Sequence, residues 1–213
     1  MKVKLIIMMA FCFVVYMAKA QVSIGVKGGL NVSSIEEYDG FSLDSRAGFN
    51  AGFMLQYMIN DNVGIESGLY YSLMGGKEKE KDYDNPNRID DYTAKANPAY
   101  LQLPLYAIYK FNLGKNVQLY PSLGIYLGCG LSGDYELKGQ DDGVAIDKKE
   151  KFFNDERNRF DMGAGVGLNF QFNRTVLGIG YEQGFMKINK HEFLYEDEDA
   201  YNSNLKMSIG YLF

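Results

Sequence analysis

The sequence predicts an all-β fold, an eight-stranded antiparallel up-and-down transmembrane β-barrel, and three observations predict it. Beyond residue 21 the chain contains eight segments in which apolar residues alternate with other residues, which is the period of a strand with two different faces. The connections between these segments are alternately short and long. The apolar face of the segments carries aromatic residues toward both ends, as strands that cross a bilayer do.

The first four segments are residues 22–30, 49–57, 63–73 and 100–110. The first alternates Val and Ile with Ser, Gly and Lys, and the second places Phe, Ala, Leu and Tyr at its odd positions. The third follows the tight turn at 60–62, and the fourth sets leucines against Tyr and Gln. Most of these segments reach the ~9–11 residues that a membrane-crossing strand needs.

The last four segments are residues 117–128, 160–172, 177–185 and 205–213. The sixth is the most regular, because its apolar residues from Phe160 to Phe172 alternate without a break with Asp, Gly, Asn and Gln. The second face of all eight segments is mostly Gly, Tyr, Ser, Asn and Gln with isolated charges. A sandwich or soluble barrel would turn a more highly charged face to water, so the apolar face is predicted to meet lipid.

The connections support the same arrangement. Short ones lie at 60–62, 111–116 and 173–174. Long polar ones are predicted at about 31–45, 75–97, 132–156 and 187–203. Outer-membrane barrels have an even number of strands, short periplasmic turns and long extracellular loops.

The N-terminus predicts export through a cleaved signal peptide, residues 1–20, followed by a barrel domain at 21–213. Lys2 and Lys4 precede an apolar stretch from Leu5 to Met17, and Ala18-Lys19-Ala20 supplies a small-residue cleavage site. The alternative, a membrane anchor, would need roughly 20 apolar residues. The expected location is the outer membrane of a Gram-negative bacterium.

Composition excludes several function classes. Cleavage would change the formal net charge from −5 to −8, which argues against a nucleic-acid partner, because neutralising phosphates requires clustered Lys and Arg. Only Cys129 would remain, so no intramolecular disulfide is expected. No cofactor or metal site is expected.

Aromatic residues near the ends of the apolar faces predict two membrane-interface girdles. The predicted girdle residues are Phe49, Tyr57, Tyr71, Tyr109, Phe160, Phe170, Phe172, Phe185, Tyr211 and Phe213. The final strand ends on Phe213, which resembles the terminal signal that outer-membrane assembly machinery recognises. Barrel-assembly machinery is therefore an expected partner through this strand.

The inward face predicts a filled lumen. Eight strands enclose a space that side chains can just fill, and we expect glycines on one wall to make room for tyrosines from the other. The inward charges are expected to form a salt-bridge network, because a buried charge is costly unless it is paired; an ion-conducting path is the alternative. These charges are Arg46, Glu66, Lys110, Arg159, Asp161, Glu182 and Lys206.

Carboxylates cluster in the long connections. They occur at 82–91, 141–142 and 196–199. A calcium site is one interpretation, but no segment has the spaced ligand pattern of a calcium loop. The favoured interpretation is a solvated surface that also meets outer-membrane lipid and the cations that bridge lipopolysaccharide.

Four motifs carry a resemblance to a known family. They are residues 24–31 (IGVKGGLN), 100–105 (YLQLPL), 159–167 (RFDMGAGVG) and 178–184 (GIGYEQG). The chain resembles the small outer-membrane β-barrels called porin-like or PorT-like, within the OmpA-type barrel superfamily. The resemblance implies the barrel fold over essentially the whole mature chain. PorT-like members are implicated in a secretion and gliding apparatus, and the family has no single activity.

The leading hypothesis is a structural or interaction role without enzymatic activity. The alternatives are a component of a secretion or gliding apparatus, a narrow solute channel, and a lipid-modifying enzyme. An enzyme would need His191, the only histidine, with Ser132 or Ser203 as nucleophile. No spacing joins these residues into a catalytic triad.

Overall fold

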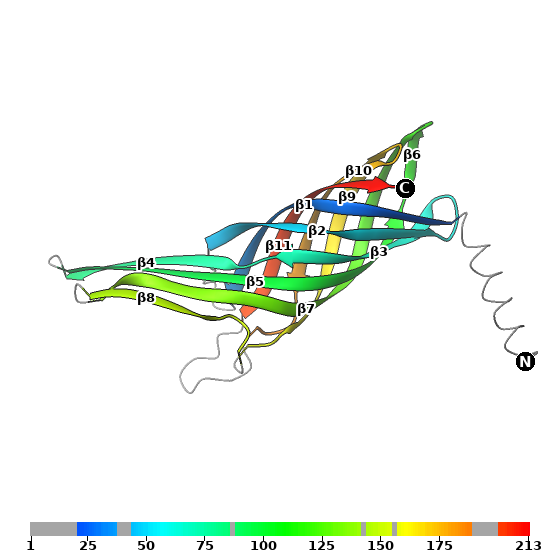
Figure 1. The fold of residues 1–213 in the computed structure, drawn as a ribbon. Coiled ribbons are helices and arrows are strands. Elements are labelled where there is room, and N and C mark those ends of the chain that lie inside the picture. Colours follow the sequence, from blue (N-terminus) through cyan, green and yellow to red (C-terminus); the bar gives the residue numbers. More distant parts are fainter. Residues whose placement is uncertain (1–20, 38–43, 86–87, 142–143, 155–156, 189–199) are drawn as a thin grey trace, which may run out of the picture.

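The computed structural model describes residues 21–37, 44–85, 88–141, 144–154, 157–188 and 200–213. The predicted signal peptide lies outside these residues. The described chain forms one antiparallel sheet of eleven strands (Figure 1). These strands are β1 (Val22–Glu37), β2 (Asp44–Met58), β3 (Val63–Leu73), β4 (Gly76–Asn85), β5 (Arg88–Tyr109), β6 (Phe111–Gly114), β7 (Val117–Asp141), β8 (Val144–Lys151), β9 (Phe160–Phe172), β10 (Thr175–Gly184) and β11 (Ala200–Leu212).

Eight of these strands close into a ring. Each pairs with the next in the order β1, β2, β3, β5, β7, β9, β10, β11, and β11 pairs again with β1. The predicted eight-stranded antiparallel barrel is therefore confirmed. Closure leaves these strands without a free edge, as a bilayer requires of spanning β-structure. Where the chain is described, it contains no helix long and apolar enough to cross a membrane.

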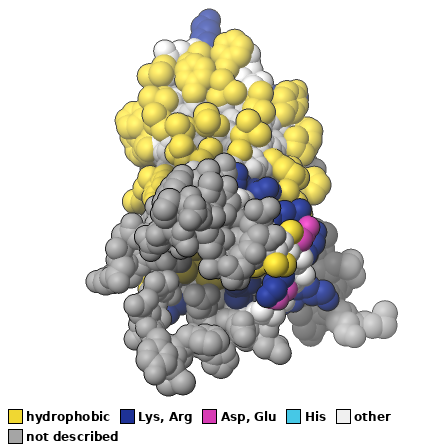
Figure 2. Space-filling model, turned by 90° about the vertical axis from the view of Figure 1, so that its left-hand side faces the viewer, with side chains coloured by type: hydrophobic (Ala, Val, Ile, Leu, Met, Phe, Trp, Pro, Cys, Tyr) yellow, Lys and Arg dark blue, Asp and Glu magenta, His cyan; other side chains and the backbone are white. Residues whose placement is uncertain are grey.

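The register places the apolar residues of the barrel strands on the outside. Val26 of β1 pairs with Phe53 of β2 and Tyr211 of β11, and all three side chains are exposed. Figure 2 shows hydrophobic side chains gathered over the barrel, with Lys, Arg, Asp and Glu mostly outside this band. An apolar surface of this extent matches the lipid-facing band of an outer-membrane barrel.

Two of the predicted long loops are instead β-structure. Residues 75–97 form β4 and the first half of β5, and most of 132–156 forms the second half of β7 and β8. These segments pair in the order β4, β5, β7, β8 and extend beyond the barrel at the left of Figure 1. We call this four-stranded part the projecting sheet. These strands could not be recognised in the sequence because both faces of the projecting sheet carry polar residues. Apolar and polar residues therefore do not alternate along them.

The other two long connections are also shorter than predicted. The first strand continues to Glu37 and the last begins at Ala200, and these two residues pair with each other. Residues 31–37 were predicted to form a loop because polar Ser34 and Glu36 follow Val32 on the outward face, so the apolar alternation ends there. Asn31 and Ser33 are inward residues of this part of β1. Both side chains are buried in the lumen.

Gly75 joins the barrel to the projecting sheet. Its φ is 139°, a conformation that residues with a Cβ rarely adopt. A Cβ at this position would lie 2.0 Å from the carbonyl oxygen of Ala96. The Ser33 hydroxyl holds the turn, because it accepts from Gly75 N at 2.9 Å and donates to Gly75 O at 3.0 Å. The change of direction between β3 and β4 therefore depends on glycine.

Cross-strand ion pairs connect strands of the projecting sheet. Lys149 lies 3.0 Å from Asp134 and 3.3 Å from Glu136, and Lys138 lies 3.8 Å from Asp147. The hydrogen bonds from Lys149 to Asp134 and Glu136 raise its pKa. Exposed pairs of this kind contribute little stability individually, so the sheet depends mainly on its backbone hydrogen bonds.

Candidate functional site

The lumen contains a first charged cluster around Glu66, which is buried on β3. Its carboxylate accepts from Lys27 Nζ at 2.9 Å and from Gln56 Nε2 at 2.8 Å. The hydroxyl of Tyr120 donates to the same carboxylate at 3.2 Å. These donors come from β1, β2 and β7, so Glu66 connects three other strands of the barrel.

A second cluster surrounds Glu182, which is buried on β10. It forms an ion pair with Lys206 of β11. The hydroxyl of Tyr106 donates to it at 2.7 Å, and Gln102 Nε2 donates at 3.3 Å. Lys206 Nζ also donates to Gln102 Oε1 at 2.9 Å. Because β5 and β11 face each other across the ring, this bond crosses the lumen.

Lys110 and Asp161 lack an ion-pair partner among the described residues. Lys110 Nζ donates to Gln56 Oε1 at 2.8 Å and to Gln171 Oε1 at 2.9 Å. Asp161 Oδ2 accepts from Tyr126 at 3.1 Å and from Asn202 at 3.0 Å. Neutral side chains thus take the place of a counter-ion for both groups, although Oδ1 of Asp161 has no hydrogen-bond partner within the described residues.

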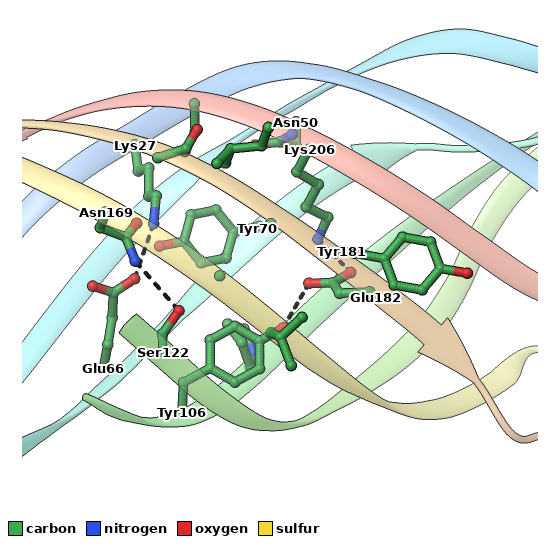
Figure 3. Close-up of a pocket in the computed structure, with 17 residues that line it drawn as sticks. Lys27, Asn50, Glu66, Tyr70, Tyr106, Ser122, Asn169, Tyr181, Glu182 and Lys206 are labelled. Carbon is green, nitrogen blue, oxygen red and sulfur yellow. Dashed lines mark hydrogen bonds and ion pairs between the residues drawn. The ribbon is translucent and has the colours of Figure 1, made fainter. Parts of the chain in front are cut away.

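Between the Glu66 and Glu182 clusters lies a cavity of about 70 Å³ (Figure 3). The side chains of Lys27, Glu66, Lys206 and Glu182 line it, as do the glycines at 167, 178 and 180. Asn50 also lines it, and its Nδ2 has no hydrogen-bond partner within the described chain. A polar space of this size has room for a few water molecules and no larger solute.

Apolar clusters lie at both ends of the lumen. The base cluster is formed by Met54, Tyr70, Ile108, Tyr120, Val176 and Leu212. The mouth cluster, where the barrel passes into the projecting sheet, is formed by Ile35, Met74, Ala96, Tyr100, Phe152, Phe153, Ile188 and Ala200. Apolar side chains that pack across a narrow barrel exclude water, so the lumen is filled rather than open.

The predicted packing of tyrosine against glycine is confirmed. A Cβ on Gly165 would lie 2.5 Å from the hydroxyl of Tyr106, and one on Gly163 would lie 2.6 Å from the ring of Tyr126. Gly165 is on β9 and Tyr106 is on β5. The Tyr106 ring therefore packs against the backbone of a strand that β5 does not pair with.

Gly165→Ala is expected to destabilise the barrel by about 1–3 kcal/mol, the usual effect of overpacking. The added methyl would displace the Tyr106 hydroxyl and weaken its hydrogen bond to Glu182. Urea unfolding in lipid vesicles, followed by tyrosine fluorescence, measures the change. Gly28→Ala is the matched control, because its Cβ would approach no atom closer than 3.4 Å. Equal stability of the two variants would contradict the packing.

The seven predicted lumen charges fall into two groups. Glu66, Lys110, Asp161, Glu182 and Lys206 lie in the lumen, as described. Arg46 and Arg159 instead bond to backbone carbonyls where the projecting sheet joins the barrel, Arg46 to Ala96 at 3.1 Å and Arg159 to Gly130 at 3.2 Å. Lys27 was not among the predicted lumen charges. It lies between Val26 and Gly28, which face outward on β1, so the alternation of the strand already placed its side chain inward.

All ten predicted girdle aromatics have exposed side chains on the barrel. Phe49 and Tyr71 have ring centroids 6.1 Å apart, and Tyr211 and Phe213 have centroids 6.0 Å apart.

Cys129 is a free thiol on the same outward face. His191 lies outside the described residues, as do the side chains of most of the acidic clusters. Ser203 is buried in β11 and Ser132 is exposed.

Comparison with known families identifies the chain. Residues 18–190 match the family described as outer membrane protein beta-barrel domain. The chain belongs to this family. The apolar outer band and the closed ring of eight strands are therefore those of an outer-membrane barrel protein.

Solved outer-membrane proteins are similar to this barrel. The attachment invasion locus protein Ail of Yersinia pestis is 19% identical, with a TM-score of 0.46 over 91% of this chain and 99% of its own. Neisserial surface protein A is 18% identical, with a TM-score of 0.42 over 90% and 99%. OprG from Pseudomonas aeruginosa is 14% identical, with a TM-score of 0.44 over 91% and 96%. Comparison with curated proteins found no match.

Proposed function

We propose that this outer-membrane barrel is a non-enzymatic interaction protein, in which the barrel is the anchor and the projecting sheet is the part that contacts a partner. The observation that carries the proposal is the extension of β4, β5, β7 and β8 beyond the barrel. By the general orientation of outer-membrane barrels, this end is extracellular. Because β5 and β7 run from the barrel into the projecting sheet, the barrel holds this sheet beyond the membrane as a platform for contact.

The edges of the projecting sheet support this role. Within the described residues β8 pairs only with β7, and β4 pairs only with β5 beyond Lys77. The side chains of β8 are nearly all exposed, and Val144 is 66% exposed. Unpaired strand edges offer a row of backbone donors and acceptors to another chain. Lysines along β8 also reduce unspecific pairing, so a partner must complement both backbone and charge.

The filled lumen favours this proposal over a solute channel. Purified protein in planar bilayers is expected to give no stable, ohmic single-channel steps, because the Lys206–Gln102 bond and the two apolar clusters span the interior. Regular steps that persist in a preparation free of porins would contradict the proposal and support the channel.

The direct test compares three strains: a deletion strain, the same strain with the full chain, and one with shortened hairpins. In the shortened chain, residues 78–95 and 135–150 are each replaced by a short turn, and the barrel strands are kept. The full chain and the shortened chain are both expected to reach the outer membrane and to show heat-modifiable gel migration. Only the full chain should restore attachment of the cells to surfaces or to one another. Equal restoration by the shortened chain would refute the proposal.

The same strains address the other candidates. Loss of surface export in the deletion strain, restored by both chains, would support a secretion or gliding component of the PorT type. Lipid A and phospholipid profiles that are unchanged by His191→Ala would agree with the absence of enzymatic activity. The proposal also includes export with cleavage before Gln21 and assembly through the C-terminal strand. N-terminal sequencing of the mature protein tests the cleavage.

A further inference from the structure

The free edge of β8 carries charges of both signs. Lys148, Glu150 and Lys151 are exposed and have no ion-pair partner within the described residues. Lys149 differs from them, because two carboxylates of β7 lie 3.0 Å and 3.3 Å from its Nζ. A strand that pairs with this edge must therefore place a cation opposite Glu150 and an anion opposite each of the two unpaired lysines, since like charges directly opposite each other destabilise a sheet.

A second copy of β8 that runs antiparallel to the first supplies this pattern. When Lys149 lies opposite Lys149 of the second copy, Lys151 lies opposite Asp147 and Lys148 lies opposite Glu150. Two-fold symmetry repeats both of these pairs, so four opposite-charge pairs flank one pair of lysines. The two central lysines are those that carboxylates of their own sheets already compensate.

The neighbouring registers are less favourable. A two-fold symmetric antiparallel pair centres on one residue, because residues opposite each other share a face of the sheet. A register centred on Lys148 places this unpaired lysine opposite itself and gives only two opposite-charge pairs. Registers centred on Asp147 or Glu150 give none. The charges of β8 therefore select pairing across Lys149.

The antiparallel direction places the two barrels in different membranes. β8 runs toward its own membrane, because Val144 at its start pairs with the last residue of β7, and Lys151 at its end pairs with Asp134 near the barrel (Figure 1). An antiparallel β8 runs away from this membrane, so the barrel that carries it lies beyond the projecting sheet. Barrels in one membrane share an orientation, and parallel pairing of their β8 strands in register would place each charge beside its like.

We propose that the partner of the projecting sheet is a second copy of this chain on a facing cell, joined to the first by antiparallel pairing of the two β8 edges. The inference rests on the proposed function and names its partner. Backbone hydrogen bonds join the two projecting sheets into one, and the charges of β8 fix the register. Because lysines on an edge disfavour pairing with other strands, the same charges restrict the contact to this chain.

Cells of the deletion strain that carry the full chain, in two populations with different fluorescent labels, test the proposal. They are expected to form mixed clusters, which deletion cells without the chain should not join. Two swaps that leave the net charge unchanged form a matched pair. Lys148→Glu with Glu150→Lys retains the four opposite-charge pairs and should cluster as the full chain does. Asp147→Lys with Lys148→Asp makes all four pairs like-charged and should reduce clustering to the level of the deletion strain.

Two further double variants should rescue each other. Lys148→Glu with Lys151→Glu makes all four pairs acidic, and Asp147→Lys with Glu150→Lys makes all four basic. Neither population is therefore expected to cluster by itself, whereas a mixture of the two regains four opposite-charge pairs and should cluster. Heat-modifiable migration and equal amounts at the cell surface establish that each variant is folded and exported.

The proposal is overturned if the two charge-neutral swaps cluster equally, or if the mixture of acidic and basic variants does not cluster. It is also overturned if deletion cells join the clusters, because the partner is then another surface component. Each of these results leaves the proposed function standing, provided that the chain with shortened hairpins fails to restore attachment. Attachment restored by the shortened chain would instead refute the proposed function itself.

Discussion

Glu66→Ala is expected to lower the free energy of unfolding by about 3–5 kcal/mol, the usual cost of removing one partner from a buried ion pair. Glu66 is 4% exposed and accepts hydrogen bonds from Lys27, Gln56 and Tyr120. Without it, Lys27 retains a partly buried charge with no counter-ion, and Lys110 loses the favourable electrostatic influence of the Glu66 carboxylate. Urea unfolding in lipid vesicles measures the effect.

Two further variants separate the charge from the hydrogen bonds. Glu66→Gln preserves part of the hydrogen bonding, so its free energy of unfolding should lie between those of the unaltered chain and Glu66→Ala. Combining Glu66→Leu with Lys27→Met removes both charges and should recover much of the loss, because an apolar pair of similar volume avoids the cost of desolvating ions. A double variant no more stable than Glu66→Ala would show that Lys27 is not the main partner.

Phe153→Ala is expected to cost about 3–5 kcal/mol, as for large aromatic side chains removed from a core. Phe153 is 5% exposed, and its ring lies at right angles to Tyr100, with centroids 5.4 Å apart, and to Phe152, with centroids 5.0 Å apart. A Cβ on Gly130 would lie 2.3 Å from the ring, so the barrel wall is shaped around it. Removing the ring leaves a cavity in the mouth cluster.

The same substitution should also loosen β8, which ends two residues before Phe153. Hydrogen exchange of the β7–β8 amides should therefore become faster in Phe153→Ala, while the amides between β9 and β10 keep their protection. Val144→Ala is the control, because Val144 is on the same strand and largely exposed. An unchanged exchange rate in β8 would show that the projecting sheet is held without the mouth cluster.

The barrel strands could be predicted because the bilayer imposes one consistent requirement on them. In β9 every second residue from Phe160 to Phe172 meets lipid and is apolar, while the residues between them face the lumen. In β8 both faces meet water, so Lys148 and Lys149 occupy successive positions and no period-2 pattern survives. The projecting sheet was for this reason assigned to loops.

The candidate lumen site was predicted in part for a similar reason. Alternation places Glu66, Lys110, Asp161, Glu182 and Lys206 on the inward face correctly, since that depends only on strand register. Arg46 and Arg159 also fall on that register, but they lie where the wall bends into the projecting sheet. At that position each guanidinium donates to a backbone carbonyl and forms no ion pair with a described carboxylate. The alternation of residues along the sequence does not predict where the wall bends.

The sequence by itself determined the outer-membrane location, the number of barrel strands and the outward face of each barrel strand, because these depend on local alternation and on connection length. Only the tertiary structure decided which polar side chains meet in the lumen, since partners such as Lys206 and Gln102 lie 104 residues apart on opposite walls. Their meeting depends on the stagger of the strands around the closed ring. The tertiary structure alone also continued β5 and β7 past the barrel and paired them there with β4 and β8, because backbone pairing requires no apolar face.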